Sequence, residues 1–154
     1  MILGLEDVEK RRWGYWDQNK KVGLTSGCFD ILHAGHLHVL NEAKRYCDIL
    51  IVAVNTNDSV RQLKGLGRPI NDATDRALLI DSLKPVDFVI YNSRLNNNSL
   101  VRILKPDFYI KSGEYSETST SAALVEEYHG ATIFIPVLPG YSSTKIIQKI
   151  KNVG

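Results

Sequence analysis

Short apolar runs alternate along the chain with segments in which apolar residues recur every three or four positions. A short apolar run bounded by turn residues predicts a strand buried on both faces, whereas the longer spacing predicts an amphipathic helix. Five runs predict strands at residues 22–25, 48–54, 86–91, 107–111 and 131–137. The helical spacing predicts helices at residues 35–47, 57–63, 72–83, 121–129 and from 143 onward, with a short helix ending at residue 104.

Repeated strand–helix units predict an α/β fold built on a doubly wound five-stranded parallel sheet. The chain has 154 residues, which suits one domain, so residues 1–154 are treated as a single domain with a helix in residues 1–20 packed outside the core. Ligands of such sheets bind beyond the carboxyl ends of the strands. Functional residues are therefore expected in the loops at 26–35, 55–58, 92–98, 111–118 and 137–143.

Two helix ends carry specific predictions. Asp72 opens the helix at 72–83, and a second acidic residue three positions later predicts a capped N-terminus. Leu78, Leu79 and Leu83 are predicted to form one face of this helix. Gly130 follows the helix at 121–129, in the position typical of a C-cap glycine.

The composition is that of a soluble globular protein, with 44% apolar and 23% charged residues. The formal net charge of +2 is too small to predict a nucleic-acid partner, and the basic run at residues 10–12 is interpreted as a solvated face. Charge begins at Glu6, which excludes a signal peptide, and the longest aliphatic run, 49–54, is too short to span a membrane. Cys28 and Cys47 form no disulfide pattern. We therefore expect a cytoplasmic protein with two buried thiols and no membrane partner.

The segment SGCFDILHAGHLHVL, residues 26–40, carries the most distinctive chemistry because it crosses from a predicted strand into a predicted helix. A helix N-terminus presents unpaired N–H groups and the positive end of the helix dipole. His33 and His36 stand at this end, with Gly35 between them to let the backbone approach a ligand. The combination predicts a phosphate site, although neither the P-loop motif nor the dinucleotide-binding glycine motif is present.

The histidines have two other interpretations. Zinc could be bound by His33, His36 and His38 with Cys28, but the spacing lacks the usual pair four residues apart. Packing alone is also compatible with the composition, and for His38 a solvated or core-edge position is the better interpretation. Packing explains His33 and His36 less well, because a glycine accompanies them at the carboxyl edge of a sheet.

Three further segments could complete the site. Residues 64–69, KGLGRP, place two cations on a glycine-rich loop that could swing onto a polyphosphate. Residues 140–145, GYSSTK, combine a glycine, hydroxyls and a lysine at a predicted helix start, which is a second phosphate-ready terminus. Residues 110–115, IKSGEY, could hold a base or ribose through backbone groups. Together with the histidine segment, these loops suit a nucleoside triphosphate attacked at its α-phosphate.

Four segments fall in the order and spacing of the cytidylyltransferase-like nucleotidyltransferase family: GCFDILHAGH, LKGLGRPIN, KPDFYIKSGEY and GYSSTKII. The resemblance covers about Leu5 to Ile150. Within the family, the chain most resembles the heptose branch, the adenylyltransferase domain that makes ADP-heptose from heptose 1-phosphate and ATP. It implies a Rossmann-like nucleotidyltransferase fold and transfer of a nucleoside monophosphate from ATP to a sugar phosphate, with release of pyrophosphate. It also implies a homodimer and, because this domain is often fused to a sugar kinase, a separate kinase as a partner.

The resemblance implies a role for each matched residue. The catalytic set would stabilise charge on the phosphates and comprises His33, His36 and Lys64. The nucleotide-binding set comprises Cys28, Phe29, Asp30, Gly35, Lys111, Gly113, Glu114, Gly140, Tyr141, Ser142, Ser143 and Thr144. The acceptor-binding set comprises Arg68 and Asn55. No protein cage for a metal is expected, and Mg²⁺ would bridge the triphosphate of ATP.

The chain departs from the family's pattern at four places. Ser26 stands where the family has Asn, Ser143 where it has Thr, and KSGE at residues 111–114 where it has KGGD. Residues 92–99 lack the acidic, proline-containing loop expected in the heptose branch. These differences concern the acceptor and the base, so a glycerol-3-phosphate cytidylyltransferase and a flavin adenylyltransferase are alternatives. A nucleotide-binding regulator without turnover is an alternative of another class.

Overall fold

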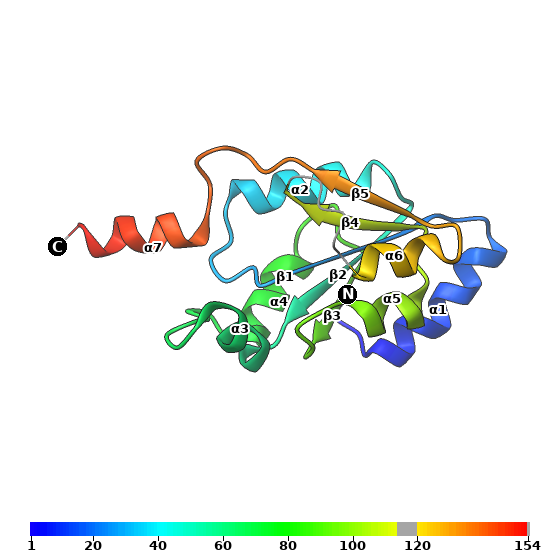
Figure 1. Ribbon diagram of the computed structural model, residues 1–154, viewed down its shortest axis with the longest axis horizontal. Coiled ribbons are helices and arrows are strands. Elements are labelled where there is room, and N and C mark those ends of the chain that lie inside the picture. The colour runs from blue at the N-terminus through cyan, green and yellow to red at the C-terminus, as the bar shows by residue number, and fades with distance from the viewer. Residues whose placement is uncertain (114–119, 154) are drawn as a thin grey trace.

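A computed structural model describes residues 1–113 and 120–153 and shows one five-stranded parallel sheet. The strands lie in the order β3-β2-β1-β4-β5 (Figure 1). Their bounds are β1 Val22–Gly27, β2 Ile49–Asn55, β3 Phe88–Asn92, β4 Phe108–Ser112 and β5 Ala131–Ile135. The chain moves from β1 outward to β3 and then returns to place β4 on the other side of β1. The order therefore reverses between β1 and β4, which is where such sheets bind ligands.

Seven helices connect or flank these strands in the described residues. Their bounds are α1 Leu5–Asp17, α2 Ala34–Lys44, α3 Asn57–Lys64, α4 Ala73–Asp81, α5 Asn98–Leu104, α6 Thr120–Glu126 and α7 Ser143–Lys151. The doubly wound parallel sheet predicted from the apolar pattern is confirmed, with boundaries shifted by a few residues. No helix in the described part of the chain is both long and apolar enough to cross a membrane.

Successive residues of a strand point to opposite faces of the sheet. Helices cover both faces, so both sets of side chains are buried. In β2, Ile51 and Ala53 pack with residues of α1, α5 and α6 on one face. Leu50, Val52 and Val54 pack with residues of α2 and α4 on the other. Figure 1 shows α1, α5 and α6 grouped together, whereas α7 extends away from the sheet. Side chains of α7 contribute none of the buried residues, so this helix is placed by its first turn.

Helix α1 packs against the core through Val8, and one expectation for this segment was wrong. Arg12 is only 5% exposed and is not part of a solvated basic face. Its guanidinium donates from Nε to the carbonyl of Leu104 at 3.1 Å and from Nη2 to the carbonyl of Lys105 at 2.9 Å. Nη2 also donates to Asp107 at 3.1 Å. A sequence pattern cannot distinguish this arginine from its exposed neighbours, because its partners lie more than ninety residues away in the chain.

The predicted face and cap of α4 differ from the structure. Arg76, Ala77 and Ile80 are fully buried, whereas Leu78 and Leu79 are exposed. Asp72 stands at the N-cap but makes no capping bond with its side chain. Its carboxylate instead accepts from the amide of Asn57 at 2.8 Å, which ties α4 to α3.

The role of Gly130 also differs from the expected C-cap. The left-handed residue after α6 is His129, with φ of 66°. A β-carbon at Gly130 would lie 2.7 Å from Cγ1 of Val125 and 3.0 Å from the carbonyl oxygen of Pro106. Glycine is therefore required here for close packing between the end of α6 and the start of β4.

The buried position of Arg12 predicts that Arg12→Ala lowers the free energy of unfolding by about 3 kcal/mol, the usual cost of removing one partner of a buried charged network. Lys10→Ala is the matched control, since Lys10 lies on the same helix and is exposed. Urea denaturation should show a change within about 0.5 kcal/mol for the control. Equal effects of the two substitutions would contradict the anchoring role of Arg12.

Candidate active site

A pocket of about 590 Å³ opens at the carboxyl end of β1, between the N-termini of α2 and α7. Thirteen of the residues predicted for the site line it: His33, His36, Lys64, Cys28, Phe29, Asp30, Gly35, Arg68, Asn55, Tyr141, Ser142, Ser143 and Thr144. These residues come from four segments that are distant in the sequence. The sheet therefore brings together the histidine segment, the KGLGRP loop and the start of α7.

Three predicted nucleotide-binding residues lie outside the pocket lining, and one cannot be placed. Lys111 directs its ammonium group over the ring of Phe134, at 5.8 Å from the ring centre. Gly113 and Gly140 have φ of 118° and 89°, which glycine adopts readily, and each is next in sequence to a residue that lines the pocket, Ser112 or Tyr141. Glu114 lies outside the described residues.

The two histidines stand at the first turn of α2. His33 is the N-cap, and its Nδ1 accepts from the backbone N–H of His36 at 3.3 Å. A neutral His33 ring must then carry its proton on Nε2. The two imidazoles stack with centres 3.8 Å apart, and Phe29 packs edge-on against His36 at 5.2 Å. The capping role of His33 was not predicted from the sequence.

The free pocket favours neutral histidines. Burial, reinforced by the neighbouring His33, lowers the pKa of His36 to about 4. Burial also lowers the pKa of His33, and its own backbone hydrogen bond opposes that shift. Nδ1 of His36 is buried and has no hydrogen-bond partner among the described residues. A bound polyanion would reverse this preference, because a nearby negative charge stabilises the charged imidazolium.

The geometry of the imidazole pair differs from that of metal ligands. Ligands of one zinc ion direct nitrogen or sulfur lone pairs at a common point, whereas these rings lie face to face, with 16° between their planes. Within residues 1–113 and 120–153, no three His, Cys, Asp or Glu residues are grouped closely enough to hold a metal ion.

The second helix terminus is held against the first by short contacts. Ser142 caps α7, accepting from the N–H of Lys145 at 3.1 Å. Ser143 donates to the carbonyl of Ile31 at 3.1 Å and accepts from the N–H of the same residue at 3.4 Å. A β-carbon at Gly35 would lie 2.9 Å from Cβ of Tyr141 and 3.0 Å from the ring of His33. Gly35 therefore permits the close approach of α7, rather than only that of a ligand.

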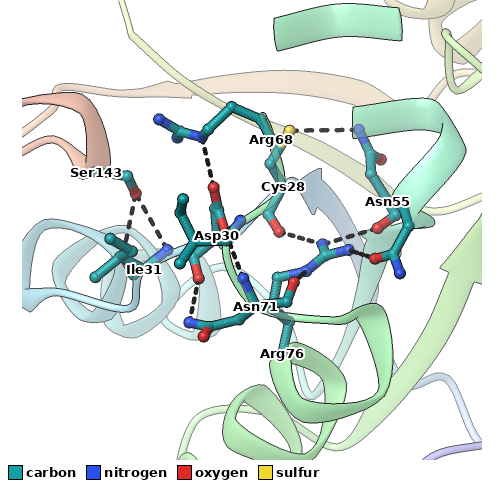
Figure 2. A network of polar contacts seen from close by, with 10 residues as sticks. Cys28, Asp30, Ile31, Asn55, Arg68, Asn71, Arg76 and Ser143 are labelled. Atoms are coloured by element: carbon teal, nitrogen blue, oxygen red, sulfur yellow. Dashed lines mark hydrogen bonds and ion pairs between the residues drawn. The ribbon is translucent and has the colours of Figure 1, made fainter. Parts of the chain in front are cut away.

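Asp30 fixes the far end of the KGLGRP loop. Its side chain is almost fully buried and accepts from Nε of Arg68 at 2.6 Å and from the N–H of Ile70 at 2.6 Å. The N–H of Asn71 adds a third bond at 3.1 Å, and its side-chain amide donates to the carbonyl of Asp30 at 2.7 Å (Figure 2). The carboxylate of Asp30 is thus occupied by the protein itself. Only the first part of the loop, at residues 64–67, is left without such anchoring.

Arg76 was not predicted for the site, yet it joins more of the site's backbone than any predicted residue. The guanidinium is fully buried and donates to the carbonyls of Cys28 and Asn55, the latter at 2.8 Å. It also donates to the carbonyl of Asn71 at 2.9 Å and to the side chain of Asn57 at 3.0 Å (Figure 2). The loops after β1 and β2 are therefore held at a fixed separation. An arginine three positions into a helical pattern carries no sequence signal for this role.

Lys64 is an exposed cation on the pocket wall. It is the last residue of α3, and Gly65 follows it with φ of 91°. Arg68 and Lys64 come from the same loop, but Arg68 is neutralised in part by Asp30, whereas Lys64 makes no ion pair among the described residues. Its charge is thus available to a ligand in the pocket.

Two helix N-termini, a histidine pair and an available lysine around one pocket are features typical of α/β proteins that bind phosphate groups. The sequence profile of the family described as cytidylyltransferase-like matches residues 24–149. The chain belongs to this family, and it is an enzyme of the nucleotidyltransferase class.

Curated relatives cover nearly the whole chain. A protein described as bifunctional protein HldE from Sulfurimonas denitrificans is 41% identical over 150 residues, 97% of this chain and 31% of its own length. The protein of the same description from Granulibacter bethesdensis is 44% identical over 133 residues, 86% of this chain and 27% of its own. The chain thus spans about a third of the length of these relatives.

Solved structures share the architecture. A lipopolysaccharide core biosynthesis protein from Thermoplasma volcanium superposes with a TM-score of 0.63 at 29% identity, covering 77% of this chain and 97% of that protein. The pantoate-beta-alanine ligase of Francisella tularensis superposes with a TM-score of 0.65 at 18% identity, covering 98% of this chain and 77% of the ligase. The second likeness concerns the fold alone.

The lowered pKa of His36 can be measured by NMR titration of its imidazole. We expect titration near 4 in the free protein and a higher pKa when inorganic triphosphate is added. Because the native state binds the proton less readily than the unfolded chain, stability should fall as pH is lowered from about 7 towards 4. His36→Gln should lose less stability over this range than the unmodified protein. An ordinary His36 pKa of 6.5 in the free protein would contradict the burial argument.

Proposed function

We propose that this chain transfers the adenylyl group of ATP to a sugar phosphate, most specifically heptose 1-phosphate, and releases pyrophosphate. The observation that carries the proposal is the convergence of the α2 and α7 N-termini on one pocket that also holds His33, His36 and Lys64. The sequence similarity of GCFDILHAGH and LKGLGRPIN to the heptose branch supports the sugar. The 29% identical relative from lipopolysaccharide core biosynthesis supports the same class of acceptor.

In the proposed reaction, an oxygen of the acceptor phosphate attacks the α-phosphorus of ATP. The new phosphorus–oxygen bond forms as the bond to the bridging oxygen of the β-phosphate breaks, and pyrophosphate leaves with that electron pair. An acceptor phosphate is already ionised near neutral pH, so no proton has to be removed before attack. The requirement on the protein is therefore alignment of the reactants and stabilisation of the growing negative charge.

The roles of the pocket residues follow from this requirement. The N-termini of α2 and α7 direct backbone N–H groups towards the phosphates. Nε2 of His33 is the protonated nitrogen of its neutral ring and would donate to a phosphate oxygen. His36 would take up a proton as the polyanion binds, because its pKa rises from its low value in the free protein. Lys64 would neutralise charge on the leaving pyrophosphate.

Mg²⁺ belongs to the substrate in this scheme. Asp30 lines the pocket, but its carboxylate oxygens already accept three hydrogen bonds from residues 68–71. A divalent ion would therefore be bound by the triphosphate oxygens and would enter as MgATP, where it offsets phosphate charge.

A homodimer and a separate sugar kinase stay predictions. The relatives that share this domain are described as bifunctional, and this chain corresponds to about a third of their length. We propose that a separate enzyme supplies the phosphorylated sugar when the domain acts alone.

A substrate panel tests the proposed function. Pyrophosphate release should be fastest with ATP and heptose 1-phosphate, and slow with CTP and glycerol 3-phosphate or with ATP and riboflavin phosphate. A preference for CTP would overturn the adenylyl assignment but not the nucleotidyltransferase class. Turnover of ATP with a different sugar phosphate would overturn the heptose assignment alone. Nucleotide binding without turnover of any pair would support a regulator instead.

The two functions of His33 can be separated by a pair of substitutions. His33→Ala removes the imidazole and the helix cap, whereas His33→Asn removes the imidazole but keeps a capping side chain. We expect both variants to lose roughly 10²-fold or more in kcat, as when one transition-state donor is removed. Thermal unfolding should show a loss of stability for His33→Ala and a smaller one for His33→Asn. Recovery of kcat in His33→Asn would mean that the residue acts only as a cap.

A further inference from the structure

A chain of hydrogen-bonded amide side chains joins the carboxyl ends of β1, β2 and β3 to Tyr109 of β4, and it reaches the active-site pocket at Ser26 and Asn55. Asn92 and Asn55 end their strands and are 3% and 7% exposed, and Asn97 lies in the loop before α5. Nδ2 of Asn92 donates to Oδ1 of Asn97 at 2.9 Å and to Oδ1 of Asn55 at 3.5 Å. Nδ2 of Asn97 donates to Oγ of Ser26 at 2.6 Å and to the hydroxyl of Tyr109 at 2.7 Å.

The direction of every bond in this chain is fixed by one backbone group. Oδ1 of Asn92 accepts from the N–H of Arg94 at 3.1 Å, and a backbone N–H can only donate. Asn92 must therefore donate from its nitrogen to Asn97 and Asn55. Asn97, accepting on its oxygen, must in turn donate from its nitrogen to Ser26 and Tyr109.

The fixed hydrogen-bond directions affect the pocket at Ser26 and Asn55, which both line it. Because Oγ of Ser26 accepts a hydrogen bond from Asn97, the hydroxyl proton of Ser26 is available to be donated to another group. Because Oδ1 of Asn55 accepts a hydrogen bond from Asn92, Nδ2 of Asn55 is the group that can donate. Among the described residues, the partner of Nδ2 is Sγ of Cys28, at 3.8 Å. This side of the pocket thus presents hydrogen-bond donors.

Donors in this position suit a ligand rich in oxygen acceptors. The pocket is also lined by Val137, Leu138 and Tyr141, which follow β5 on the other side of β1 from β2 and offer apolar surface for a base. The donor side also contains Lys64 and Arg68, which favour a phosphate ester. A ligand that complements this side of the pocket is a polyhydroxylated acceptor that carries a phosphate.

We propose that Ser26 and Asn55 donate hydrogen bonds to hydroxyl oxygens of the acceptor sugar, and that Asn97 and Asn92 are positioning residues that set this donor polarity. The proposal rests on the proposed function, because it assigns the acceptor end of the same site. It also gives a joint role to two features that depart from the family pattern, Ser26 and the loop at residues 92–99. They are bonded directly to each other through Asn97 and Ser26.

The experiment reverses the direction of the hydrogen bond between residue 97 and Ser26 with a side chain of nearly the same shape. In Asn97→Asp, the carboxylate can still accept from Asn92 but can no longer donate to Ser26, whose hydroxyl proton would turn towards it and away from the pocket. Asn96→Asp is the matched control, because this substitution adds the same charge to the same loop. Asn96 is exposed and does not line the active-site pocket. Initial rates are measured with ATP and heptose 1-phosphate, each varied at saturating levels of the other.

We expect Asn97→Asp to raise the KM for the sugar phosphate roughly 10- to 100-fold, the usual range when a hydrogen bond to a bound group is lost. The KM for ATP should stay within about twofold, as should both constants in Asn96→Asp. Ser26→Ala should raise the acceptor KM similarly, and the double variant should be no worse than either single one, because both act through the same donor. Ser26→Ala alone tests the donor should Asn97→Asp fail to fold.

The outcomes distinguish failure of the inference from failure of the proposed function. If the unmodified enzyme turns over ATP and the sugar phosphate but Asn97→Asp and Ser26→Ala leave the acceptor KM unchanged, the inference is wrong. An equal rise in the KM for ATP, or a fall in kcat that tracks lost thermal stability, would show a merely structural role. Absence of turnover in the unmodified enzyme would instead refute the proposed function, on which the inference rests.

Discussion

The buried guanidinium of Arg76 is the constraint on which the active-site edge of this sheet depends. A charge taken fully out of water must be matched by hydrogen bonds, and Arg76 finds them on three separate loops, at Cys28, Asn55 and Asn71. Burial lowers the pKa of this arginine from its ordinary value, and the nearby negative charge of Asp30 opposes the shift. The floor of the pocket is thereby fixed before any ligand arrives.

Hydrogen bonds within the protein also position the segments that line the sides of the pocket. The carboxylate of Asp30 accepts hydrogen bonds from residues 68–71 and so gives Arg68 a defined position at the pocket. Ser143 does the equivalent for α7 by bonding to both backbone groups of Ile31. Preorganisation of this kind lowers the reorganisation needed in the transition state. Lys64, at the end of α3, makes no ion pair with the described residues, so its charge is available to a ligand.

His33 and His36, at the first turn of α2, combine a structural role with a chemical one. His33 satisfies a backbone N–H of α2 and also lines the pocket, while partial burial beside another imidazole lowers the pKa of His36 to about 4 and so favours its neutral form. Ligand charge, rather than solution pH, is then the main control on the protonation of His36 near neutrality. In the proposed reaction, polyphosphate binding and proton uptake by His36 would therefore be linked.

The sequence by itself determined the parallel α/β sheet, because runs of apolar residues buried on both faces can form few other structures. It also identified the segments that meet at the pocket, since the carboxyl ends of parallel strands must share one edge. Only the tertiary structure revealed Arg12 and Arg76 as buried anchors, the use of Asp30 as a loop clamp and the bond between Asn97 and Ser26. Each of these depends on partners from distant parts of the chain, and local patterns of polarity do not record which distant groups a side chain will meet.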